Sequence, residues 1–198
     1  MHSYSHENGK EKSPLVILTL LALCVAVVAN WLFSLQDWVP SWMASAPTVA
    51  GAYALLYFLL DKYAWKWRVL HALGVIHTPV ISGKYLGTLV SSNSLSRPIE
   101  IQIDQTWNRM VVRFEIQSPT SSYSLSFAAS LISVGHESAR LIYVYRNQTQ
   151  PGAADLDMGD HEGTAELTIN IQSGQLKGRY YNYRGNKGSL ELARQNQN

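Results

Sequence analysis

Tyrosine, asparagine and arginine residues near the C-terminus form the most chemically capable pattern in this sequence. Tyr180, Asn182 and Arg184 are spaced two apart within GRYYNYRGNKGSLEL, so an extended strand would place them on one face. An earlier segment ends in a similar way, where Tyr145 is followed by Arg146. Aromatic faces stack on nucleobases, and guanidinium groups bind phosphates through paired hydrogen bonds. These residue types therefore predict a site for a ligand that carries bases and phosphates.

A further tyrosine, Tyr85, lies in GKYLGTL close to two glycines that leave space for another group to approach. The candidate ligand-binding residues are Tyr85, Tyr145, Arg146, Tyr180, Asn182 and Arg184. Their inward orientation depends on strand phase. A β-bulge in the strand before Tyr180 would invert that phase and turn Tyr181 and Tyr183 inward instead.

Signatures of the common enzyme classes are missing from the sequence. There is no Gly-Lys-Ser/Thr phosphate loop, no G-x-S-x-G elbow and no H-E-x-x-H motif, and the one cysteine, Cys24, lies in an apolar stretch. Residues 147–162 include several acidic side chains but lack the ligand order of an EF-hand loop. We therefore expect a binding protein with no catalytic residues, no metal site and no cofactor.

The candidate residues belong to a region with the period of a β-sheet. From Ser82 onward apolar and polar residues alternate, as in the segment IEIQID at residues 99–104. About eight short strands can be read at hairpin spacing, and no helix remains to cover an open sheet edge. We therefore expect an all-β domain of about eight antiparallel strands in an up-and-down barrel, with a sandwich as the alternative. The expected core rows are Leu125 with Phe127, Leu167 with Ile169, and Leu190 with Leu192.

Two uncharged apolar stretches precede the β region, at residues 14–33 and 42–60. Each has roughly 20 residues, which in a helix matches a hydrocarbon core of about 30 Å. Alanines at four-residue spacing would let the two helices pack closely. They are Ala22 with Ala26, and Ala46 with Ala50 and Ala54. We expect a transmembrane helical hairpin; a cleaved signal peptide is the alternative.

Basic residues predict the orientation of this hairpin. Two lysines precede the first stretch and three basic residues follow the second, whereas the short connection carries only Asp37. By the positive-inside rule, both termini are cytoplasmic. The expected organisation is a cytoplasmic tail at 1–13, the hairpin at 14–60, a basic and aromatic juxtamembrane linker at 61–79 and the ligand-sensing barrel at 80–198.

The whole arrangement resembles the membrane effectors of cyclic-oligonucleotide-based antiphage signalling systems (CBASS). The resemblance covers nearly the whole chain and rests on the double span, the short basic linker, the GKYLGTL strand and the GRYYNYRGNKGSLEL hairpin. In that family an infection-activated nucleotidyltransferase makes a cyclic nucleotide, and the β-barrel binds it. The effector then assembles in the inner membrane and disrupts it, killing the infected cell.

The resemblance implies a cyclic dinucleotide as ligand and the bacterial inner membrane as location. It also implies three partners: the cognate nucleotidyltransferase that supplies the ligand, the lipid bilayer, and further copies of the chain on activation. Duplex DNA or RNA is not expected as a partner, because basic and acidic residues almost balance from residue 80 onward. Two other functions stay open: a membrane-anchored barrel that holds a lipid or small apolar metabolite, and a hydrolase that acts inside the barrel.

Overall fold

The computed structural model describes residues 1–6, 12–35, 49–92, 95–116, 122–135, 137–149 and 161–195. The chain divides into two compact units. One unit combines Met1–Asn8 with Thr78–Asn198, and the other is Gly9–His77. Because each unit has its own contacts, the two are described separately.

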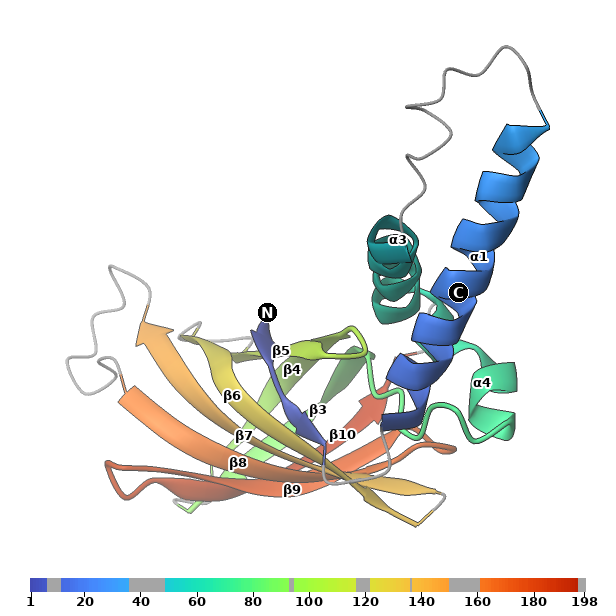
Figure 1. Ribbon diagram of the computed structural model, residues 1–198. Coiled ribbons are helices and arrows are strands. Elements are labelled where there is room, and N and C mark those ends of the chain that lie inside the picture. Colours follow the sequence, from blue (N-terminus) through green and yellow to red (C-terminus); the bar gives the residue numbers. More distant parts are fainter. Residues whose placement is uncertain are drawn as a thin grey trace. The chain divides into compact units, whose positions relative to one another are not determined.

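Eight antiparallel strands form a closed barrel in the first unit (Figure 1). They are β3 (Gly83–Ser91), β4 (Ser96–Gln105), β5 (Arg109–Ile116), β6 (Ser122–Val134), β7 (Ser138–Thr149), β8 (His161–Asn170), β9 (Gln175–Asn182) and β10 (Lys187–Arg194). Each strand pairs with the next one along the chain, and β10 pairs back onto β3. The predicted up-and-down barrel is confirmed, and the sandwich alternative is excluded.

The barrel interior follows the alternation predicted from the sequence. Ile99, Ile101 and Ile103 of β4 are at most 1% exposed, whereas the polar residues between them are half-buried on the outer face. The rows predicted for β8 and β10 are buried as well. Apolar side chains from the inner faces therefore meet in one continuous core, and burial of this apolar surface is what stabilises the barrel.

The core row predicted on β6 is wrong. Phe127 is 49% exposed and Leu125 is only partly buried, whereas the serines that alternate with them face the interior. The register of β6 against β7 shifts between Ser126 and Ala128, which marks a β-bulge at this point. Beyond the bulge Leu131 faces the core. The sequence shows alternation here but not its phase, because the serines of β6 can face the interior and its apolar residues can lie on the outer face.

The N-terminal segment completes the barrel wall. β5 and β6 pair directly only between residues 113–116 and 122–125. Farther along, β1 (His2–Ser3) pairs with β5 and β2 (Ser5–His6) pairs with β6, so the segment fills the opening between them (dark blue in Figure 1). Residues 1–13 are predicted from the sequence only as a tail, because strands of two residues have no periodicity to detect.

The second unit contains α1 (Lys12–Ser34), α3 (Val49–Lys62), the 3₁₀ helix η1 (Ala64–Lys66) and α4 (Arg68–Ala72). The part of α1 at Pro14–Phe33 is long and apolar enough to cross a membrane, with a mean hydropathy of 2.6. α3 covers the C-terminal part of the second predicted span, whose residues 42–48 lie outside the described residues. The structure thus shows one candidate spanning helix among the described residues, and the second span stays a prediction.

Helices α1 and α3 pack against each other. Ala22 and Ala26 of α1 are almost fully buried, in line with the expected close packing. Ala50 and Ala54 of α3 are exposed, and the one buried residue of that helix is Leu60. Ala50 and Ala54 therefore do not form the α3 side of this packing, and Ala46 lies outside the described residues.

Candidate ligand pocket

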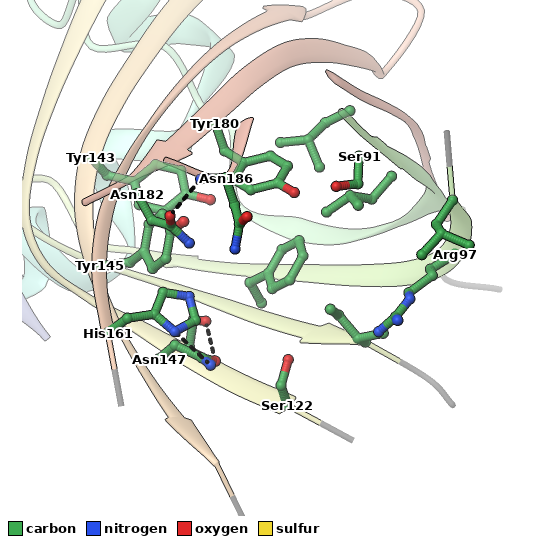
Figure 2. Close-up of a pocket in the computed structure, with 16 residues that line it drawn as sticks. Ser91, Arg97, Ser122, Tyr143, Tyr145, Asn147, His161, Tyr180, Asn182 and Asn186 are labelled. Carbon is green, nitrogen blue, oxygen red and sulfur yellow. Dashed lines mark hydrogen bonds between the residues drawn. The ribbon is translucent and has the colours of Figure 1, made fainter. Parts of the chain in front are cut away.

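A pocket opens at the end of the barrel where β3 meets β4, β5 meets β6, β7 meets β8 and β9 meets β10 (Figure 2). It holds about 1020 Å³ of empty space, including its open mouth. The polar and aromatic lining residues are Ser91, Arg97, Phe114, Ser122, Ser124, Tyr143, Tyr145, Asn147, His161, Tyr180, Asn182 and Asn186.

Three of the six candidate residues line this pocket. Tyr145 on β7 and Asn182 on β9 both pair with Gly163 of the intervening β8, so they share one row across the wall. Tyr180 lies two residues before Asn182 on the same face. The pairing of β9 with its two neighbours has no register shift, and Tyr181 is 55% exposed. The predicted phase of β9 is therefore found, and the inverted phase is excluded.

Tyr85 does not line the pocket. Its side chain is 1% exposed within the core, and its hydroxyl donates a hydrogen bond of 2.9 Å to the carbonyl oxygen of Ile81. The two neighbouring glycines accommodate the barrel wall instead of a ligand. A Cβ on Gly87 would lie 2.0 Å from the carbonyl oxygen of Glu191 on the paired strand β10.

The two predicted arginines also lie away from the pocket lining. Arg146 follows Tyr145 directly, so strand alternation turns it to the outer face, where it forms an ion pair of 2.6 Å with Glu162. Arg184 is exposed in the turn after β9. Because β9 ends at Asn182, alternation no longer determines where Arg184 points. The structure thus brings together Tyr145, Tyr180 and Asn182 and not the other three candidates.

Two glycines make room for the pocket tyrosines. A Cβ on Gly163 would lie 2.4 Å from the Oη atom of Tyr145, and a Cβ on Gly188 would lie 2.7 Å from the Cε1 atom of Tyr180. Real Cβ atoms do not approach other atoms so closely. Each tyrosine ring therefore lies over a glycine on a neighbouring strand, and these two glycines set the positions of the rings.

We expect Gly163→Ala to displace the Tyr145 ring and to destabilise the chain by about 1–3 kcal/mol, the usual cost of an added methylene in a packed site. Urea unfolding of the purified chain measures this change. Thr168→Ala, on an exposed position of the same strand, is the control and should cost no more than about 0.5 kcal/mol. Equal unfolding midpoints for the two variants would show that Tyr145 does not depend on Gly163.

The side-chain amide of Asn182 has a fixed orientation. Its Oδ1 atom accepts hydrogen bonds from the backbone N–H groups of Arg184 at 3.1 Å and Asn186 at 3.0 Å. Both partners are obligatory donors, so the accepting atom must be the oxygen. The Nδ2 atom consequently keeps its N–H groups for a ligand in the pocket that Asn182 lines (Figure 2).

A second amide, that of Asn147, belongs to a short hydrogen-bonded chain. Its Oδ1 atom accepts a bond of 2.9 Å from the Ser124 hydroxyl, and its Nδ2 atom lies 3.5 Å from Nδ1 of His161. The oxygen of the Asn147 amide thus faces Ser124, and its Nδ2 atom faces the opposite way, toward His161. Since an amide oxygen is not a base, the Ser124 hydroxyl has no activating partner in this chain of bonds.

The described lining of the pocket contains one permanently charged side chain. Burial raises the pKa of the Tyr145 phenol, and the nearby Tyr180 phenol raises that pKa further. Burial likewise raises the pKa of Tyr143. Both hydroxyls therefore stay protonated at physiological pH and can donate hydrogen bonds. Among the described lining residues, Arg97 is the only Lys, Arg, Asp or Glu, and it lies on the side of the pocket opposite His161 in Figure 2.

Sequence reasoning missed several lining residues. Tyr143 and Asn147 share the inward phase of Tyr145, so extending the alternation in both directions would have identified them. Arg97 lies on β4 two residues before Ile99, in the inward phase of the isoleucine row. Following that row back past Pro98 would have identified Arg97 as well.

The described lining offers stacking surfaces, directed N–H donors and one guanidinium, and it offers no nucleophile paired with a base. A closed eight-stranded barrel with such a pocket has the architecture of barrels that hold one small ligand. Residues 76–194 match the family model described as "Cap15, cyclic dinucleotide receptor domain". The chain belongs to this family.

A relative supports the same placement over more of the chain. The "CD-NTase-associated protein 15" of Yersinia aleksiciae is 26% identical over 184 residues, which cover 89% of this chain and 85% of that protein. The predicted resemblance to CBASS effectors is thus confirmed by the family match.

Proposed function

We propose that the pocket binds a cyclic dinucleotide and that this binding activates the chain as a membrane effector of antiphage defence. The observation that carries the proposal is the presence of two tyrosines, Tyr145 and Tyr180, beside directed amide donors in one open-mouthed pocket. A cyclic dinucleotide has two bases to stack and two phosphates to pair. Membership of the cyclic dinucleotide receptor family supports this choice of ligand.

Both bases and one phosphate of the proposed ligand have assigned partners in the described lining. Tyr145 and Tyr180 would stack on the bases, since stacking tolerates any base. The Nδ2 groups of Asn147 and Asn182 would donate to acceptor atoms on the bases or phosphates. Arg97 would pair with a phosphate, for which a guanidinium has the right charge and geometry. Tyr85, Arg146 and Arg184 have no part in this assignment.

The helical unit supplies the output in this proposal. Residues 14–33 and 42–60 would both span the bacterial inner membrane, with the termini and the barrel in the cytoplasm. A nucleotidyltransferase would make the ligand, the occupied barrels would self-associate, and the gathered hairpins would disrupt the membrane and kill the infected cell. Such a switch requires the ligand to bind the assembled state more tightly than the monomer.

Dye-filled phospholipid vesicles containing the full chain test this function. We expect a panel of 3′,3′-cyclic dinucleotides built from adenosine, guanosine and uridine monophosphates to include at least one that releases the dye. The matching linear dinucleotides are the control, because they cannot present both bases and both phosphates in the same fixed ring. Binding of a cyclic dinucleotide without dye release in any vesicle would contradict the proposed membrane output.

A barrel that holds a lipid or small apolar metabolite is the second candidate. The aliphatic side chains in the lining, among them Leu89, Ile116 and Leu190, favour it. The two candidates differ in their need for a positive charge. A neutral apolar ligand gains little from Arg97, whereas a phosphate would lose a charge-assisted hydrogen bond without it.

We therefore expect Arg97→Ala to weaken cyclic dinucleotide binding by about 1.5–3 kcal/mol, roughly 10- to 150-fold. Equilibrium titration of the full chain in detergent measures the change. Lys177→Ala removes the same charge from the outer face of β9, where Lys177 pairs with Glu191, and should leave affinity unchanged. Equal cyclic dinucleotide affinities for Arg97→Ala and the unmodified chain would contradict the pairing of Arg97 with a phosphate.

A further inference from the structure

We propose that residues 2–6 are an exchangeable closing strand, and that in the active assembly this segment of one copy fills the gap between β5 and β6 of a second copy. This inference rests on the self-association in the proposed function and adds a specific interface to it. The gap will be called the seam: the edges of β5 at residues 109–110 and of β6 at residues 130–131, which β1 and β2 occupy.

The seam needs a strand to fill it. β5 and β6 pair with each other over four positions and then no longer pair directly. The backbone groups on the two edges would lack partners without β1 and β2, and an unpaired strand edge readily accepts another strand. The N-terminal segment meets this need with only two paired residues on each side.

Tyr4 anchors the segment in the seam. Its side chain is 7% exposed, and its hydroxyl lies within hydrogen-bonding distance of the carbonyl oxygens of Trp107 at 3.0 Å and Thr106 at 3.2 Å. The Nε2 atom of Gln105 donates a hydrogen bond of 3.1 Å to the same hydroxyl. These contacts select a tyrosine at this position, so the seam accepts this sequence and not any extended peptide.

A second contact joins the segment to both edge strands. Nδ1 of His2 donates to the carbonyl oxygen of Ser3, so Nε2 of the neutral ring is an acceptor, and it lies 2.8 Å from the Ser126 hydroxyl. The same hydroxyl oxygen accepts the backbone N–H of Val112 on β5 at 2.8 Å. Ser126 pairs in register with Tyr145, a lining residue of the pocket. A shift of Tyr145 on ligand binding therefore acts on the strand that holds His2.

Exchange between copies would preserve all of these contacts, because a second copy carries the same segment and the same seam. Domain swapping is a low-cost route to association for this reason. Because β1 and β2 each pair over only two residues, few contacts must break before the segment leaves the seam. Tethering in one membrane raises the effective concentration of neighbouring copies.

The position of the segment in the chain gives the exchange a consequence. His6 is six residues before Lys12, where α1 begins, and six extended residues span at most about 20 Å. A segment seated in a neighbour would therefore keep the barrel of one copy close to α1 of the next. Repetition of this contact would link several apolar helices through the barrels.

Disulfide trapping between two differently tagged full-length copies tests the exchange. One copy carries Ser3→Cys and the other Arg109→Cys, both with Cys24→Ala; Ser3 and Arg109 are opposed in register, and both are exposed. Neither copy can form an intrachain disulfide, so a cross-linked dimer requires a segment in the seam of another copy. The copies are co-expressed in membranes and treated with the panel of cyclic dinucleotides.

A matched control uses Lys177→Cys in one copy and Glu191→Cys in the other. These residues are opposed on β9 and β10, which pair over seven residues within the barrel and should not exchange. A single copy with both Ser3→Cys and Arg109→Cys should form an intrachain disulfide without ligand, which shows that its own segment is seated and the variant is folded.

We expect a ligand-dependent, reductant-sensitive dimer from the seam pair and none from the control pair. Assembly of the unmodified chain is followed separately by native electrophoresis. Ligand-driven assembly without a seam disulfide would overturn the exchange and leave the proposed function standing. If the ligand drives no assembly at all, the proposed function fails, and the exchange in the active assembly fails with it.

Discussion

Asn182→Asp should abolish the response to a cyclic dinucleotide while leaving the barrel folded. The substitution keeps the oxygen that accepts the backbone N–H groups of Arg184 and Asn186, so the turn after β9 retains both bonds. It replaces the N–H donor with a carboxylate oxygen, which these two N–H groups help to keep ionised. A negative charge would then face an anionic ligand.

The expected loss of affinity is at least about 100-fold. A hydrogen bond to a charged group contributes about 1.5–3 kcal/mol, and a like charge placed against the ligand costs several kcal/mol more. Equilibrium titration of the full chain measures the affinity, and thermal unfolding without ligand measures the stability. Because the change is nearly isosteric, a loss of binding with unchanged stability assigns the effect to the pocket.

Asn170→Asp is the matched control for this prediction. The Oδ1 atom of Asn170 also accepts two backbone N–H groups, those of Gln172 at 3.1 Å and Ser173 at 2.8 Å, in the turn between β8 and β9. The charge change is the same, but Asn170 does not line the pocket. Similar losses of affinity in both variants would show that overall charge, and not the Asn182 donor, controls binding.

Tyr180→Ala should weaken binding by about 1–3 kcal/mol, which is roughly 5- to 150-fold, because it removes one stacking surface. The ring is partly buried and lies over Gly188, so its removal leaves an open space in the pocket and not a void in the sealed core. The effect on stability should therefore be smaller than the effect on affinity. Titration and unfolding of the same preparation separate the two.

The neighbouring residue provides the control. Tyr181→Ala removes the same side chain from the outer face, where Tyr181 is 55% exposed, and should leave affinity unchanged. The comparison also tests the strand phase of β9 in solution. A loss of binding in Tyr181→Ala but not in Tyr180→Ala would mean that the opposite face of the strand meets the ligand.

The predicted strands were recovered wherever burial imposes a period of two. The isoleucines of β4 and the apolar rows of β8 and β10 showed which face of each strand points into the barrel. A residue that faces the core cannot be polar without a partner, so the apolar row had to be the inner one. On β6 this constraint is weaker. Its inward serines lie beside the pocket, and the bulge near Phe127 resets the phase, so the pattern around Leu125 indicated the wrong face.

The candidate pocket was predictable to the extent that strand alternation continued through it. Tyr145, Tyr180 and Asn182 were found because they lie on regular strands. Arg97 also continues the inward phase of Ile99 on β4 and was missed only because that row was not followed past Pro98. The N-terminal strands are different, because they pair with distant strands over only two residues each. Contacts of this kind depend on the closure of the whole barrel, so no local pattern in the sequence contains them.

Calorimetric titration of the purified full-length chain in detergent with the panel of cyclic dinucleotides tests the central claim most directly. We predict saturable binding of at least one member to a single site, with the binding lost in Asn182→Asp, reduced in Tyr180→Ala and unchanged in Asn170→Asp and Tyr181→Ala. Saturable binding that both pocket variants retain would place the ligand elsewhere on the chain. No binding of any member to a chain shown by its thermal unfolding to be folded would contradict the claim that this pocket is a cyclic dinucleotide receptor.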